Sequence, residues 1–95
     1  MQTKGKSSSA GRRGKWFLYI LECQDGKFYT GITKDIDRRL KAHNEGKGAS
    51  FTRMRRPVKV IYHETLKSRA QALIREYAVK ALPRKKKEEL VAMGC

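Results

Sequence analysis

Residues 16–32 read WFLYILECQDGKFYTGI, two short apolar runs joined by Gln24-Asp25-Gly26. The stretch is typical of a β-hairpin whose three-residue loop is a type I turn followed by a glycine in the left-handed region. A loop of this kind fixes which residues face each other across the two strands. The expected pairs are Cys23 with Lys27, Leu21 with Tyr29, and Tyr19 with Gly31.

The length of this loop decides where the two tyrosines of the hairpin point. Because side chains alternate between the two faces of a strand, the three-residue loop places Tyr19 and Tyr29 on one face, roughly 7 to 8 Å apart. A two-residue Asp25-Gly26 turn would instead put them on opposite faces. With the longer loop, the other face carries apolar residues suited to a core: Leu18, Ile20, Phe28 and Ile32.

The chain of 95 residues is strongly basic, with 23 Lys and Arg against nine Asp and Glu and a formal net charge of +14. Because the positive charge is spread over several segments, it favours a nucleic acid over a membrane surface as partner. Apart from Met1, residues 1–15 carry no large apolar side chain, so we expect a disordered basic tail at residues 1–15 followed by one domain at residues 16–92. No stretch is typical of a signal peptide or a membrane span, which indicates a cytoplasmic protein. We expect a monomer, and the cysteines lack the spacing of a zinc site.

The segment after the hairpin is typical of a helix. Asp35 is a suitable N-cap, Ile36 and Leu40 form a short apolar stripe, and an Asn-Glu-Gly sequence ends the pattern. At roughly 100° per residue, Arg39 and His43 lie together along one edge of that stripe. We therefore expect Arg39 to meet the sheet.

Residues 46–57 form a glycine-containing loop rich in positive charge. Such a loop can collect phosphates, with Ser50 and Thr52 as additional donors. An ordinary solvated basic loop is an equally good interpretation of the same residues. The candidates for nucleic-acid binding are Lys47, Arg53, Arg55 and Arg56.

The remaining residues predict one strand and two helices. Residues 58–64 are rich in β-branched and aromatic side chains, which favours a third strand. Ser68 and Gln71 have capping-box spacing, and Pro83 can open a last short helix. The expected fold class is α+β, a small three-stranded antiparallel sheet flanked by helices. The stripe expected to cover the sheet from the longer helix is Ala70, Leu73, Ile74, Tyr77 and Ala81.

Five side chains could carry chemistry if the fold brings them together. A phosphodiester hydrolase needs an activated water, a positive clamp on the developing charge and often a metal ion. A tyrosine has a pKa of about 10, so a phenol needs nearby cations to act as a base at neutral pH. The residues that could meet these needs are Tyr19, Tyr29, Arg39, His43 and Glu76.

The order of these residues resembles the GIY-YIG nuclease superfamily. Leu18-Tyr19 is followed by Tyr29-Thr30-Gly31, then by Arg39, His43 and a helical Arg75-Glu76. The resemblance covers roughly residues 16–90 and is most like the small stand-alone bacterial branch, which is similar to the N-terminal module of the excision-repair endonuclease.

The resemblance implies a role for each of the five residues. Tyr19 and Tyr29 would face one site, and either could be the base, with Tyr29 slightly favoured. Arg39 would stabilise the phosphate, Glu76 would hold one Mg²⁺ or Mn²⁺ ion, and His43 would contact the water or the phosphate. Many family nucleases also use an asparagine after the glutamate helix, and no Asn follows Asn44 here.

The implied function is a metal-dependent phosphodiester hydrolase. The resemblance suggests a structure-selective DNA endonuclease in DNA repair or recombination, and RNA stays open as a substrate. The alternative is a non-catalytic basic nucleic-acid-binding protein whose tyrosines are packing or stacking residues. A third possibility is an RNA- or ribosome-associated basic protein. Glu76 separates the two main hypotheses, because a carboxylate beside a phosphate site repels the ligand of a pure binder.

Overall fold

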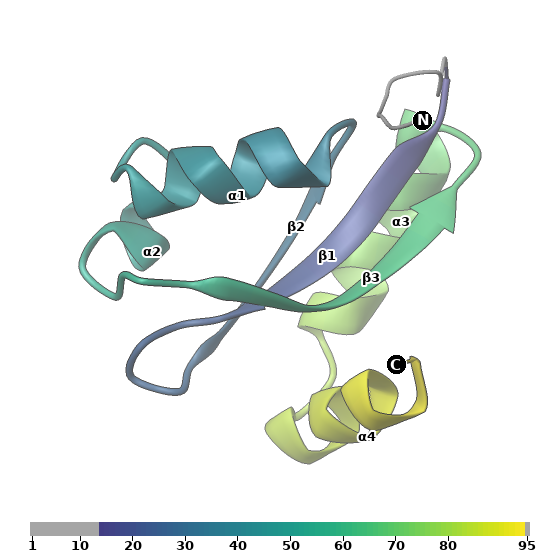
Figure 1. The fold of residues 1–95 in the computed structure, drawn as a ribbon. Coiled ribbons are helices and arrows are strands. Elements are labelled where there is room, and N and C mark those ends of the chain that lie inside the picture. Colours follow the sequence, from purple (N-terminus) through teal and green to yellow (C-terminus); the bar gives the residue numbers. More distant parts are fainter. Residues whose placement is uncertain (1–13, 95) are drawn as a thin grey trace.

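The computed structural model describes residues 14–94 as a three-stranded antiparallel sheet surrounded by four helices (Figure 1). The expected α+β class is thereby confirmed. The predicted basic tail and Cys95 lie almost entirely outside the described residues. The strands are β1 (Trp16–Glu22), β2 (Phe28–Thr33) and β3 (Lys59–Leu66), in the order β2-β1-β3. The helices are α1 (Ile36–Asn44), α2 (Ser50–Arg53), α3 (Arg69–Lys80) and α4 (Arg84–Gly94).

The hairpin has the predicted three-residue loop. The Gly26 N–H donates to the Cys23 carbonyl at 2.8 Å, and the Cys23 N–H donates to the Lys27 carbonyl at 2.8 Å. Gly26 has a φ of +85°, in the left-handed region that favours glycine. The register pairs Leu21 with Tyr29 and Tyr19 with Gly31, so both tyrosines lie on one face as predicted.

Both faces of the sheet are covered, which gives the domain two apolar layers (Figure 1). On the predicted core face, Leu18 and Ile20 are fully buried beneath α3 and α4. On the opposite face α1 packs over β1, and Tyr19 is only 2% exposed. The tyrosine face is therefore a second core, formed by Tyr19, Leu21, Cys23 and Val58 with Tyr29, Ile36, Leu40 and Val60 around them.

The prediction for the α3 stripe is wrong. The helix begins at its predicted cap, since the Ser68 hydroxyl accepts the Gln71 N–H at 3.2 Å, but it turns a different face to the sheet. Ala72 and Val79 are buried, whereas Ile74 is 71% and Tyr77 80% exposed. The small Ala72 lets the helix approach the sheet closely. The polar residues Arg75 and Glu76 lie on the same side of the helix, so the choice of its buried face by apolar residues alone pointed to the wrong side.

The segment between α1 and β3 is more ordered than predicted. Asp35 caps α1 by accepting the Arg38 N–H at 3.1 Å, as expected. The predicted loop contains the one-turn helix α2, and Thr52 within it is fully buried. Strand β3 extends to Leu66, beyond the predicted end. No helix within the described part of the chain is long and apolar enough to cross a membrane.

Candidate active site

The Tyr19 phenol lies across the neighbouring strand, directly over Gly31. These two residues are paired in the β1–β2 register. A Cβ on Gly31 would lie 2.7 Å from the Tyr19 oxygen and 2.9 Å from Cζ of the ring, closer than real Cβ atoms approach such neighbours. The glycine therefore provides the space in which the phenol lies.

His43 connects Tyr19 to the α2 segment. It is fully buried, with Nε2 3.1 Å from the Tyr19 hydroxyl and Nδ1 2.8 Å from the Thr52 hydroxyl. Gly48 lies against the imidazole so closely that a Cβ there would be 2.2 Å from Nδ1. The ring is thus held by packing and by hydrogen bonds at both nitrogens.

Tyr29 forms a second aromatic wall of the same site. The centre of its ring is 6.4 Å from that of Tyr19 and 5.2 Å from that of His43. It also stacks on Phe51 of α2 at 6.1 Å with an interplanar angle of 27°. The two tyrosines therefore share one site, as the hairpin parity predicts.

Arg39 and Glu76 act on the same phenol from two helices. Burial raises the pKa of Tyr19 to about 12, Arg39 opposes that rise, and the charges of Tyr29 and Glu76 add to it. Burial lowers the pKa of His43, and the positive charge of Arg39 lowers it further. The His43 imidazole is consequently neutral at pH 7.

Glu76 lies on α3, and among the described residues it forms one ion pair. Its side chain is 19% exposed, and Lys80 Nζ lies 3.2 Å from its Oε2. Tyr29, His43 and Arg39 thus lie next to the Tyr19 phenol, and the negative charge of Glu76 reaches it from α3.

This arrangement agrees with the comparison to known families. Residues 15–89 match the family model of the GIY-YIG catalytic domain. The chain belongs to the GIY-YIG family. Membership implies a nuclease fold that acts on nucleic acid, in a family whose nucleases are generally dependent on divalent metals.

Several bacterial relatives are similar over most of the domain. A UPF0213 protein of Staphylococcus saprophyticus is 45% identical over 84% of this chain and 98% of its own. One of Desulfotalea psychrophila is 51% identical over 83% of this chain and 73% of its own. Two solution NMR structures align with 83% of this chain and 84% of theirs: a UPF0213 protein of Bacillus halodurans at 48% identity and TM-score 0.55, and a protein of E. faecalis at 42% and 0.58. These names describe no activity.

The four residues predicted to bind nucleic acid differ in their surroundings within the GIY-YIG domain. Arg55 donates to Asp25 at 3.1 Å and to the Phe51 carbonyl at 2.8 Å, which anchors the α2 segment on the hairpin turn. Arg56 donates to the backbone carbonyls of Arg53 and Asn44. Both guanidinium groups therefore hold the fold, whereas the Lys47 side chain is 77% exposed.

A groove beside Tyr29 was missed by sequence reasoning. It runs along the edge strand β2 between α2 and the last two helices, and two lysines from different helices face it. Seven positions separate these lysines in the chain, across Pro83, so no sequence spacing marks them as a pair. The lining residues are Phe28, Tyr29, Thr30, Phe51, Lys80 and Lys87.

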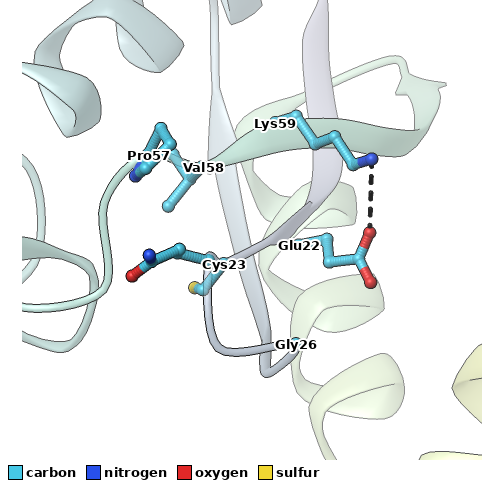
Figure 2. A pocket seen from close by; sticks show the side chains of 7 residues that line it. Glu22, Cys23, Gly26, Pro57, Val58 and Lys59 are labelled. Carbon is cyan, nitrogen blue, oxygen red and sulfur yellow. Dashed lines mark ion pairs between the residues drawn. The ribbon is translucent and has the colours of Figure 1, made fainter.

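A second hollow lies where the hairpin turn meets the start of β3 (Figure 2). Cys23 lies at this hollow as a free, buried thiol, and burial is the main cause that raises its pKa. At the rim Lys59 pairs with Glu22 at 3.6 Å. None of the five site residues lines this hollow, so it is separate from the tyrosine site.

Proposed function

We propose that this protein is a metal-dependent phosphodiester hydrolase that cuts DNA. One observation carries the proposal: the Tyr19 hydroxyl lies 3.1 Å from Nε2 of a buried histidine, with the charges of Arg39 and Glu76 acting on the same phenol. A hydroxyl between a neutral base and a cation is arranged for proton transfer next to a negatively charged substrate.

Tyr19 passes a proton from water to His43 in this mechanism. Because the pKa of Tyr19 is about 12, too little of it is phenolate at pH 7 for an already deprotonated Tyr19 to act as the base. Water instead attacks phosphorus while its proton moves to the Tyr19 oxygen and the hydroxyl proton of Tyr19 moves to His43 Nε2. The bond to the leaving sugar oxygen breaks, that oxygen takes a proton from solvent, and His43 later releases its proton. The hydrogen bond to His43 favours Tyr19 over Tyr29 as the first proton acceptor.

Arg39 and Glu76 stabilise the negative charge of the phosphate in this mechanism, one directly and one through a metal ion. Arg39 offers a fixed positive charge to the phosphoryl oxygens as negative charge builds on them. Within the described residues no group of three His, Cys, Asp or Glu side chains gathers, so Glu76 would hold a single ion that keeps most of its waters. One carboxylate together with water molecules is a set of ligands that fits Mg²⁺ or Mn²⁺, and either ion when bound would help to neutralise the phosphate.

The groove along β2 supports a path for the DNA backbone. It continues from Tyr29, and Lys80 and Lys87 can neutralise phosphates next to the one that is cut. The exposed Lys47 and Arg53 extend the positive surface on the α2 side. Phosphate contacts of this kind position a strand without reading its bases, which favours selection by DNA structure. We place the reaction in DNA repair or recombination in the cytoplasm, carried out by a monomer.

The competing function is a non-catalytic nucleic-acid-binding protein. The net charge of +14 favours it as strongly as it favours a nuclease. A pure binder gains nothing from Glu76, whose partly buried carboxylate carries a negative charge that reaches Tyr19 and would repel phosphates. The carboxylate therefore favours the hydrolase.

The test uses purified protein with nicked, flapped, branched and single-stranded DNA in Mg²⁺, Mn²⁺ or EDTA. We expect cleavage of at least one structure with a metal ion, none in EDTA, and a loss of activity on the order of 10²-fold or more in Glu76→Ala. Equal cleavage by Glu76→Ala would point to a contaminating nuclease. Salt-sensitive binding with no cleavage of any substrate would favour the binding protein.

A further inference from the structure

Thr52 lies in a segment that the sequence assigns to phosphate contacts, yet it is fully buried and turned inward. Its hydroxyl oxygen is 2.8 Å from His43 Nδ1 and donates to the Ala49 carbonyl at 3.0 Å. It therefore lies on the far side of the imidazole from Tyr19 and is too deeply buried to bind a phosphate.

The number of protons available decides how these groups are bonded. A threonine hydroxyl has one proton, and the geometry directs it to Ala49. The Thr52 oxygen must then accept a proton from His43, so Nδ1 carries the hydrogen of the neutral ring. Nε2 is left with a lone pair, which accepts the Tyr19 hydroxyl at 3.1 Å. The opposite tautomer would leave the contact between Thr52 and Ala49 without a proton.

We propose that Thr52 is a positioning residue that fixes the tautomer of His43, so that Nε2 always offers a lone pair to Tyr19. The catalytic consequence rests on the proposed function, whereas the tautomer itself does not. An Nε2–H would donate to the Tyr19 oxygen and could accept no proton from it. The hydroxyl of Thr52 thus decides the direction in which a proton can move from Tyr19.

Side-chain NMR of the histidines tests the tautomer directly. Long-range ¹H–¹⁵N spectra of the full chain at neutral pH, without DNA or metal, distinguish Nδ1–H from Nε2–H, and the exposed His63 is an internal reference. We expect Nδ1–H for His43 in the wild type and in Thr52→Ser, which keeps the hydroxyl. In Thr52→Val we expect a shift toward Nε2–H, while Thr65→Val, an exposed control on β3, leaves the spectrum unchanged.

Cleavage kinetics then test the consequence. In Thr52→Val we expect kcat to fall on the order of 10²-fold with little change in KM, and Thr52→Ser to restore most of the rate. Nε2–H in the wild type overturns the proposal whether or not DNA is cleaved, even if Thr52→Val does not fold. Nδ1–H in a wild type that cleaves no DNA overturns the nuclease function and leaves the positioning role of Thr52 standing.

Discussion

Gly31 shows that a glycine can be required for reasons other than backbone conformation. Its φ is not in the left-handed region, so its importance comes from the space above it, which the Tyr19 phenol fills. Gly31 and Tyr19 are therefore one structural unit, joined across the two strands.

Gly31→Ala should displace the Tyr19 phenol. The new methyl group would overlap the ring, which costs about 1 to 3 kcal/mol of unfolding free energy if neighbouring atoms shift to accommodate it. We expect a lower urea midpoint and a kcat reduced about tenfold or more through misplacement of the hydroxyl. A variant with wild-type kcat and stability would show that the phenol does not need this space.

His43 predicts how the reaction depends on pH. Burial first and Arg39 second lower the pKa of its imidazole, so the neutral base persists below the usual histidine range near 6.5. As pH falls through the lowered pKa, His43 takes a proton and can accept none from Tyr19. We therefore expect single-turnover cleavage to stay constant through neutral pH and to fall in more acidic solution. A rate that already declines at pH 8 would contradict a neutral His43 as the acceptor.

At the scale of elements, α4 supplies a lysine to the groove that α3 and β2 begin. Arg84 holds this helix against the hairpin: its guanidinium lies 3.6 Å from the centre of the Phe28 ring and donates to the Gly26 carbonyl at 2.9 Å. With the helix so fixed, Lys87 faces the groove, while Lys86 is exposed and pairs with Glu89 at 3.5 Å.

Lys87→Gln and Lys86→Gln form a matched pair for the path of the DNA. The test is the binding of each variant to a branched oligonucleotide as a function of salt concentration. EDTA is present so that the DNA is not cleaved. Lys87→Gln should reduce the slope of log K against log salt by about 1, whereas Lys86→Gln should change it less. Equal effects of the two variants would mean that the positive charge acts as a whole and that the groove does not guide the strand.

The ion pair of α3 should oppose metal binding. Lys80 lies 3.2 Å from the Glu76 carboxylate, the group that we propose holds the metal ion. Lys80→Gln removes the competing cation, so Mn²⁺ should bind the DNA-free protein more tightly, while DNA binding weakens. Calorimetric titration measures the first effect, with Lys85→Gln as a control on α4. A weaker Mn²⁺ affinity in Lys80→Gln would contradict the competition.

Across the whole molecule, features that depend on near neighbours in the chain could be predicted from the sequence, whereas the packing of α3 could not. The parity of the hairpin and the Asp35 cap depend on near neighbours in the chain, so the sequence predicts them and the structure confirms both. The orientation of α3 depends on contacts with residues far away in the chain, on the strands of the sheet. Arg75 lies on the sheet side of the helix and pairs with Glu64 of β3 at 2.8 Å, and the apolar Ile74 and Tyr77 consequently face solvent.

The candidate site shows the same division. The order of Tyr19, Tyr29, Arg39 and Glu76 could be matched to a family from the sequence alone. Thr52 could not, because its role depends on a one-turn helix that folds back against α1 and buries the hydroxyl beside His43. Polar residues that face each other in the core leave no periodic signal in the sequence.

In the proposed mechanism the Tyr19 hydroxyl transfers the proton of the attacking water. The most direct measurement is the single-turnover cleavage rate of Tyr19→Phe with saturating DNA and Mg²⁺ or Mn²⁺, beside Tyr77→Phe, which alters a tyrosine that is 80% exposed on α3. We predict a loss on the order of 10²-fold or more for Tyr19→Phe, with DNA binding retained, and an unchanged rate for Tyr77→Phe. A Tyr19→Phe protein that cleaves at the wild-type rate would show that this hydroxyl does not transfer the proton.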